Sequence, residues 1–145
     1  MIFEFGNMWD VYEEADVFVI TTNSYITQKN KLVMGRGIAR EARDRFPGID
    51  KRLAKSIPHM ETYGLCADPE TGIVGFQVKH HYRNKAKLKL VRYSSALLSG
   101  IASEYSSLSI HLNYPGIGNG GLKTKQVLPY IKDLDDNVHI WRFPR

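Results

Sequence analysis

Short runs of apolar residues at four places along the chain have the pattern of strands. The run at residues 15–22 is β-branched and apolar throughout, which predicts a strand covered on both faces in the middle of a sheet. Residues 1–5 alternate weakly between apolar and polar, and residues 108–112 and 138–143 form further short apolar runs. These four segments predict strands of one largely buried sheet.

Between these strands, apolar residues recur at helical spacing. Four segments show this pattern, at residues 37–46, 49–57, 88–105 and 124–132. Two more strands are joined by a turn-rich connection that predicts a hairpin, at residues 63–66 and 73–79. Because strands and helices alternate through most of the chain, with one hairpin, we expect an α/β protein with three α/β/α layers and a mixed central sheet.

Two glycine-rich segments each follow an apolar run and open a helical pattern. Such loops expose backbone N–H groups at a helix N-terminus, which suits an anion and most often a phosphate. An ordinary tight turn is the alternative, since Gly, Pro and Asn also dominate turns. We name them the early loop, residues 35–39, and the late loop, residues 115–121; their members are Gly35, Arg36, Gly37, Ile38 and Ala39, and Pro115, Gly116, Ile117, Gly118, Asn119, Gly120 and Gly121.

Length and composition restrict the class of protein. A chain of 145 residues with 43% hydrophobic content predicts a single domain over residues 1–145. The single cysteine, Cys66, excludes an internal disulfide and a cysteine-rich zinc site, so we expect no metal and no cofactor. No N-terminal run has the length and apolar character of a signal peptide or a membrane span, so we expect a cytoplasmic protein without a membrane partner.

The net charge of +5 attracts anionic ligands, and much of it lies in residues 79–92. A basic run of this kind is usually a solvated surface, and nucleic-acid binding is the sharper alternative. Aromatic residues are not interleaved with this run as they are on a base-stacking platform. The sequence therefore keeps nucleic acid as a second kind of partner.

With these elements in place, the chain resembles a macrodomain, the ADP-ribose-binding module. The residues that carry the likeness are Asn7 and Met8 after the first strand, Asn23 after the second, and the two glycine loops. The form of the early loop, together with Lys79 at the end of a predicted strand, is closest to the branch of terminal ADP-ribose glycohydrolases and of antitoxins that reverse ADP-ribosylation of DNA. The resemblance implies a macrodomain fold and, as partner, ADP-ribose or an ADP-ribosylated macromolecule.

The resemblance also implies a role for each matching residue. Both glycine loops clasp the diphosphate through backbone N–H groups, and Asn7, with Met8 beside it, stands where the family binds the adenine amino group. Asn23 hydrogen-bonds the distal ribose, and Lys79 attacks the anomeric carbon of that ribose to form a Schiff base with the opened sugar. Lys79 and Asn23 are therefore the expected catalytic residues.

This sequence departs from the family pattern at two positions. Asn7 replaces the usual aspartate, so that a neutral carbonyl accepts the bond from adenine. The late loop holds Asn119 and no carboxylate, although the glycohydrolase branch keeps a catalytic aspartate there. Loss of a general acid or base typically costs about 10²–10⁴ in rate.

The sequence thus predicts binding of ADP-ribose or a derivative in a two-loop cleft, and leaves open whether an ADP-ribosyl linkage is then hydrolysed. One alternative is a non-catalytic module that captures ADP-ribose-like signals. The other is a nucleic-acid-binding protein that uses residues 79–92. The oligomeric state is open, with a monomer as the default expectation.

Overall fold

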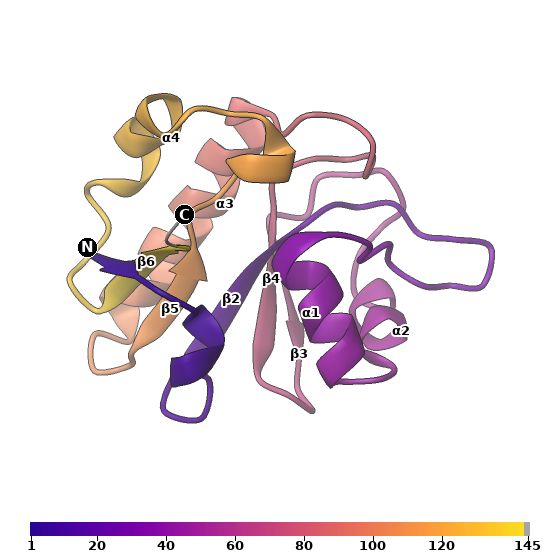
Figure 1. Cartoon of the computed structure of the whole chain (residues 1–145), viewed down its shortest axis with the longest axis horizontal. Coiled ribbons are helices and arrows are strands. Elements are labelled where there is room, and N and C mark those ends of the chain that lie inside the picture. The colour runs from indigo at the N-terminus through magenta and orange to yellow at the C-terminus, as the bar shows by residue number, and fades with distance from the viewer. Residues whose placement is uncertain (144–145) are drawn as a thin grey trace.

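The computed structural model describes residues 1–143 and consists of a six-stranded sheet with helices on both faces (Figure 1). The elements in chain order are β1 (Ile2–Phe5), the 3₁₀ helix η1 (Met8–Val11), β2 (Val17–Thr22), α1 (Gly37–Arg45), α2 (Ile49–Ala54), β3 (Leu65–Asp68), β4 (Ile73–Gln77), α3 (Leu88–Glu104), β5 (Ile110–Asn113), the 3₁₀ helix η2 (Gly118–Gly120), α4 (Thr124–Ile131) and β6 (Val138–Arg142).

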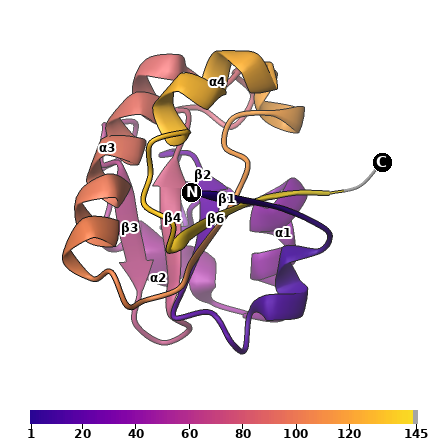
Figure 2. The ribbon, with the colours of Figure 1, turned by 90° about the vertical axis from the view of Figure 1, so that its left-hand side faces the viewer.

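The strand order is β1-β6-β5-β2-β4-β3, and all neighbours are parallel except β3 and β4. The antiparallel pair is the predicted hairpin, with its first strand two residues later than expected. Figure 2 shows the strands between α3 on one side and α1 on the other. The predicted three-layer α/β/α architecture with a mixed sheet is therefore confirmed.

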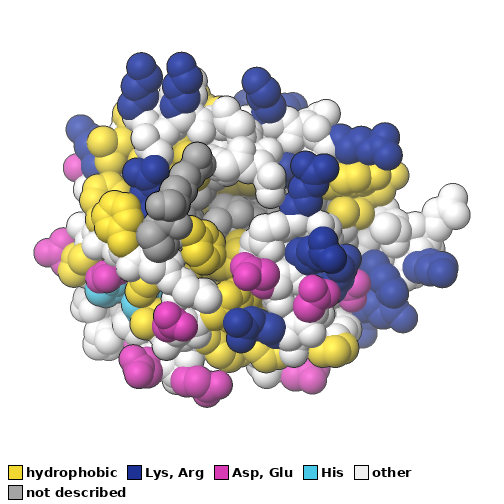
Figure 3. All heavy atoms as spheres, in the orientation of Figure 1, with side chains coloured by type: hydrophobic (Ala, Val, Ile, Leu, Met, Phe, Trp, Pro, Cys, Tyr) yellow, Lys and Arg dark blue, Asp and Glu magenta, His cyan; other side chains and the backbone are white. Residues whose placement is uncertain are grey.

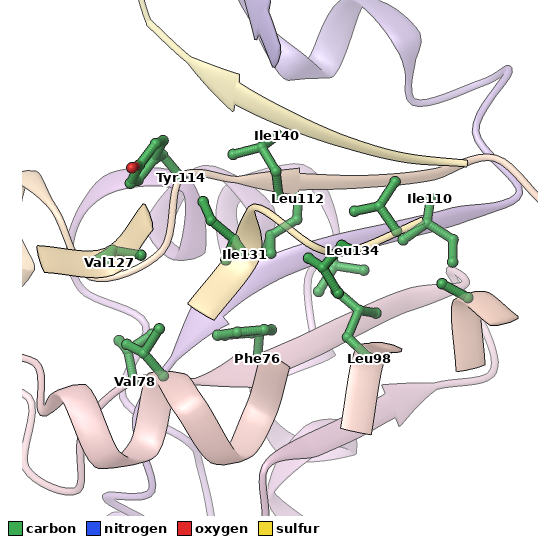
Figure 4. Close-up of a cluster of buried hydrophobic side chains, with 14 of the residues drawn as sticks. Phe76, Val78, Leu98, Ile110, Leu112, Tyr114, Val127, Ile131, Leu134 and Ile140 are labelled. Atoms are coloured by element: carbon green, nitrogen blue, oxygen red, sulfur yellow. The ribbon is translucent and has the colours of Figure 1, made fainter. Parts of the chain in front are cut away.

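One core fills the space between the sheet and the helices α3 and α4. Side chains from β4, β5 and β6 point towards these helices, and Phe76, Leu112 and Ile140 are fully buried there (Figure 4). Tyr114 lies at the rim of this core, where its hydroxyl donates to the Thr124 carbonyl at 2.7 Å. This contact fixes the start of the late loop against the start of α4.

A second core lies on the opposite face, beneath α1, α2 and η1. Its largest fully buried members are Phe18 and Met8, and the buried Trp9 packs on Phe18 with ring centroids 4.7 Å apart. The apolar run of β2 supplies both cores because alternate residues point to opposite faces. Its central position explains why this strand is buried on both sides, as its sequence predicts.

The parallel strands place five strand ends at one edge of the sheet. The carboxyl ends of β1, β2, β4, β5 and β6 lie there, and open α/β sheets bind ligands beyond this edge. None of the helices formed by residues 1–143 combines the length and the apolar character that a membrane span requires. The fold thus directs attention to the loops that follow these five strands.

Candidate functional site: a cleft across the strand ends

A cavity of about 620 Å³ lies at the carboxyl ends of the parallel strands. This volume is within the ~300–1,000 Å³ typical of small-molecule sites. Its floor is formed where β2 and β5 end, and Asn113 bridges them by accepting from the Thr21 N–H at 3.1 Å and donating to the Thr21 hydroxyl at 3.0 Å. The hydrogen bonds between the two strand ends hold this floor rigid.

Both glycine loops line this one cavity, so the expected convergence of the loops is confirmed. A Cβ built on Gly37 would lie 3.7 Å from the side-chain amide nitrogen of Asn119, which shows how closely the loops approach. Gly37 has a φ of +58°, a left-handed conformation that favours glycine at the point where the chain turns into α1. Two segments that are far apart in the sequence thus form opposite walls of the cleft.

The backbone of both loops presents free donors. Within residues 1–143, the N–H groups of Gly35 to Ala39 and of Ile117 to Asn119 donate to no other group of the chain. Several of them belong to the first turn of α1, where the helix dipole adds a partial positive charge. Such an arrangement is suited to the oxygens of a diphosphate.

The charges around the cleft are all positive. Arg36, Lys79, Arg83 and Arg142 line it, and among residues 1–143 no Asp or Glu does. The same sign prevails at larger scale, because Lys and Arg gather along the upper and right-hand parts of the face in Figure 3, towards the carboxyl ends of β2 and β4, whereas Asp and Glu gather along the lower part. The surface therefore attracts anions to the cleft.

Lys79 follows β4 and is half-buried at one end of the cleft. Its ammonium donates to the Tyr82 carbonyl at 3.1 Å. Burial lowers the pKa of Lys79, and the positive charge of Arg36 lowers it further. A lysine in this setting loses its proton more readily than a solvated one, which is what a nucleophilic amine needs.

Asn23 also lines the cleft, but the protein backbone uses its side chain. The amide nitrogen donates to the Val33 carbonyl at 2.9 Å, and the amide oxygen accepts from the Tyr25 N–H at 2.8 Å. These two bonds hold the strand-to-loop turn, which is the Asx-turn role common for asparagine at a strand end. Contact of Asn23 with a ribose stays a prediction.

Four of the predicted ligand-binding residues do not line the cavity. Pro115 is buried at the start of the late loop, and Gly121 is exposed at its end. Asn7 caps η1 by accepting from the Trp9 N–H at 3.1 Å, while Met8 is fully buried in the second core. Since β1 lies beside β6, Asn7 stands beyond the β6 end of the cleft, and its contact with adenine remains a prediction.

Several lining residues were not among the predicted site residues. One group comes from β6, whose carboxyl end contributes Trp141 and Arg142 and is followed by Phe143. The rule that ligands sit beyond strand ends could have indicated them from the predicted strand at residues 138–143. The others are Thr21, Thr22, Val33, Met34, Val78, Tyr82, Arg83, Asn113 and Tyr114.

The cleft is elongated because it crosses four strands. Its Lys79 end lies over β4 and its Arg142 end over β6, with β2 and β5 between them. At about 4.8 Å per strand, the two ends lie about 14 Å apart.

No group of three His, Cys, Asp or Glu side chains within residues 1–143 is arranged to hold a metal.

Three solved structures resemble this fold over almost the whole chain. The macrodomain of Mycobacterium tuberculosis DarG has a TM-score of 0.69 at 21% identity, covering 99% of this chain and 98% of that one. The macrodomain of Thermus aquaticus DarG has a TM-score of 0.68 at 21% identity, covering 99% and 97%. Thermosipho africanus DarTG, solved in complex with ADP-ribose, has a TM-score of 0.72 at 17% identity, covering 99% and 42%.

This chain has the macrodomain fold. The resemblance predicted from the glycine loops is thereby confirmed, and it includes macrodomains of the DarG type. In sequence, the macrodomain is 28% identical over 125 residues to the DNA ADP-ribosyl glycohydrolase of Mycobacterium bovis and to that of Mycobacterium tuberculosis, which covers 80% of this chain and 36% of each relative. The chain thus spans about a third of the length of these relatives. No protein-family model matches it.

Proposed function

We propose that this macrodomain binds ADP-ribose, with the diphosphate between the early and late loops, and removes ADP-ribose from a modified macromolecule. The observation that carries the proposal is the approach of Gly37 to Asn119 across one cavity whose walls present free backbone N–H groups. Positive side chains at both ends and the length of the cleft suit a diphosphate flanked by two sugars. A relative of the same fold was solved in complex with ADP-ribose, which supports this ligand.

The Lys79 end of the cleft is the end suited to cleavage of the bond between the distal ribose and its carrier. The amine attacks the anomeric carbon of the distal ribose, and the bond from that carbon to the carrier breaks with its electron pair and a proton going to the carrier. The ribose ring then opens to give a Schiff base with the lysine, and water hydrolyses that Schiff base, which releases ADP-ribose and restores the amine. The lowered pKa of Lys79 favours this role, whereas a bound diphosphate opposes it by favouring the ammonium form.

The carrier we propose is DNA. The relatives that match 80% of this chain in sequence are DNA ADP-ribosyl glycohydrolases. The basic surface around the cleft also fits a polyanionic carrier better than a basic protein.

Binding without cleavage is a second candidate, and one observation favours it. No carboxylate lines the cleft among residues 1–143, so no Asp or Glu is placed to act as general acid or base. Asp133, Asp135 and Asp136 lie beyond α4 and do not line the cleft. A pure binding module would keep the phosphate clasp and lack turnover.

Calorimetric titration separates the proposal from its rivals. ADP-ribose should bind and raise the melting temperature, and AMP should do so much less, because it lacks the second phosphate and the distal ribose. Equal effects of the two ligands would contradict the two-loop clasp. Binding that weakens by several orders of magnitude between low and physiological salt would instead indicate contact with many phosphates along the basic run.

Turnover is then measured on ADP-ribosylated DNA and ADP-ribosylated protein by product analysis. We expect release of ADP-ribose from DNA, abolition of this activity in Lys79→Ala, and unchanged ADP-ribose affinity in that variant within a few-fold. Unchanged turnover in Lys79→Ala would remove Lys79 from the mechanism. Absence of turnover in the wild type, with binding intact, would establish the binding module.

A further inference from the structure

Four rings from three separate segments pack together on the surface beside the Lys79 end of the cleft. Tyr25 lies edge-on to His81, Tyr82 and His59, with ring centroids 4.7, 5.2 and 5.2 Å away. His81 and Tyr82 stack with their centroids 4.5 Å apart and an interplanar angle of 24°. We name these four residues the aromatic ledge.

The aromatic ledge is not part of either hydrophobic core. Tyr25, His81 and Tyr82 are half-buried and His59 is exposed. Backbone hydrogen bonds nevertheless fix the two imidazoles, since His59 accepts from the Ile26 N–H and His81 from the Arg83 N–H, both at 3.0 Å. The rings are therefore held in place while part of their surface stays open to solvent.

The ledge is continuous with the cleft. Tyr82 belongs to both, its neighbour Arg83 also lines the cleft, and the Tyr82 carbonyl accepts from the Lys79 ammonium at 3.1 Å. The Arg83 guanidinium lies 5.6 Å from the centre of the Tyr82 ring, a cation–π distance. A group held beside Lys79 would therefore lie next to the Tyr82 end of the ledge.

Beyond the ledge lysines predominate, with Glu61 near His59 and Asp50 beside Lys51 as the acids of this region. Residues 23–31 and 79–92 contain no Asp or Glu. A second hollow, of about 390 Å³, adjoins Ile26 and carries Lys29, Lys51 and Lys55. Rings followed by cations along one path are the combination that binds single-stranded nucleic acid, because every base has a face that stacks and every nucleotide a phosphate.

We infer that the aromatic ledge holds a single-stranded nucleic acid whose modified nucleotide carries the ADP-ribose. The base beside the distal ribose stacks on Tyr82 and Tyr25, and the neighbouring phosphates reach Lys29 and Lys55. The inference rests on the proposed function, because it assigns the carrier to the Lys79 end of the cleft. In a duplex, stacking on the neighbouring base pairs covers the faces that these rings need, so a duplex fits this surface less well.

The first test uses an unmodified single-stranded oligonucleotide and, separately, free ADP-ribose. Tyr25 lies outside the cleft, so Tyr25→Ala should weaken oligonucleotide binding about 5- to 100-fold, the range expected from ~1–3 kcal/mol of stacking per base, and leave ADP-ribose affinity unchanged. Tyr105→Ala removes an exposed tyrosine at the end of α3 and serves as the matched control. Should Tyr25→Ala melt at a lower temperature, His59→Ala replaces it, because that ring is exposed.

The second test measures the salt dependence of the same oligonucleotide binding. Lys29→Gln and Lys55→Gln should each reduce the slope of log affinity against log salt by about 0.7 for every phosphate that the lysine neutralises in the wild type. Lys132→Gln changes the same charge at the end of α4 and should leave the slope as in the wild type. Arms with DNA, RNA, duplex and an acidic peptide identify the partner: tighter binding of the duplex or the peptide than of the single strands would overturn the inference.

Failure of the ledge and failure of the proposed function give different results. If Tyr25→Ala and His59→Ala bind the oligonucleotide as tightly as the wild type while ADP-ribose binds normally, nucleic-acid binding by the ledge is refuted. Diphosphate binding by the two loops is then still supported. If the wild type does not bind ADP-ribose, the clasp is refuted, and the oligonucleotide data still decide whether the ledge binds nucleic acid.

Discussion

The two glycine loops form one cleft, yet their surroundings differ. In the early loop, Gly35 and Gly37 are exposed, and a Cβ on Gly35 would meet only Val33, at 4.0 Å. In the late loop, Gly116 and Gly120 are buried, and a Cβ would lie 2.9 Å from Leu122 and 3.1 Å from Ala86, respectively. The early glycines leave space that a ligand can enter. The late glycines also leave space for neighbouring side chains of the protein, such as Leu122 and Ala86.

The contrast teaches that one sequence motif can serve two physical purposes. In the early loop, glycine is needed for a left-handed backbone and for close approach of a ligand. In the late loop it is needed in addition because side chains from residues 85–91 pack directly against the chain. Substitutions in the two loops should therefore affect different measurements.

The largest effect is expected at Gly116. Gly116→Val places a branched side chain against Leu122 at a residue with φ of +80°, and we expect the free energy of unfolding to fall by about 2–5 kcal/mol. Denaturant unfolding measures this. Gly72→Val is the control, because Gly72 has a similar φ of +75° but nothing within 4 Å, so its stability should fall by only about 1–2 kcal/mol. Equal decreases in the two variants would show that packing does not distinguish the late loop.

Gly37→Val should mainly affect the affinity for ADP-ribose. Its positive φ costs about 1–2 kcal/mol of stability, and the side chain points towards Asn119 across the cleft. We expect ADP-ribose affinity to fall by about tenfold or more, measured by calorimetry on protein shown to be folded. In Gly35→Ala, where the new methyl meets only Val33, the affinity should fall by less. A normal affinity in Gly37→Val would mean that the early loop does not contact the ligand.

The smallest effect concerns pH and the strand that leads into the late loop. His111 on β5 is buried, stacks on His139 with centroids 4.6 Å apart and accepts from the Trp141 indole N–H at 2.9 Å. Burial lowers the pKa of His111, and the neighbouring His139 lowers it further. Because the folded-state pKa lies below the usual 6.5, the unfolded chain binds more protons in that window, and stability falls as the pH drops below 6.5.

Melting curves between about pH 7.5 and 5.5 test this expectation, since they span the ordinary pKa of histidine. His111→Asn keeps an acceptor for Trp141 and should show a weaker pH dependence. His59→Asn changes an exposed ring and should keep the wild-type dependence. A profile of His111→Asn identical to that of the wild type would exclude His111 as the cause.

The sequence predicted the elements because each has a strong local signal. The apolar run of β2, the helical spacing in α3 and the Pro-Gly pair after α1 fix these elements without reference to the rest of the chain. Strand ends and glycine loops then predicted half of the residues that line the cleft, since both depend on local geometry and on one general rule of α/β sheets.

What the sequence did not predict depends on distant segments. The aromatic ledge joins Tyr25, His59 and Tyr82, which are far apart in the chain, so no local pattern indicates that these rings pack beside the basic run. Likewise, the hydrogen bonds that engage the Asn23 side chain come from its own loop after it folds back, and no residue pattern indicates them.

The Ala86 N–H donates to the Gly120 carbonyl at 2.7 Å, which ties the late loop to the segment that begins at Lys79. The same segment carries Tyr82 and Arg83, so a shift of the late loop on phosphate binding would act on the chain next to them. If such a shift alters how tightly the carrier is held, thermodynamic linkage requires the carrier to alter the affinity for ADP-ribose by the same factor. One backbone contact would then make the macrodomain discriminate between free ADP-ribose and ADP-ribose still attached to its carrier.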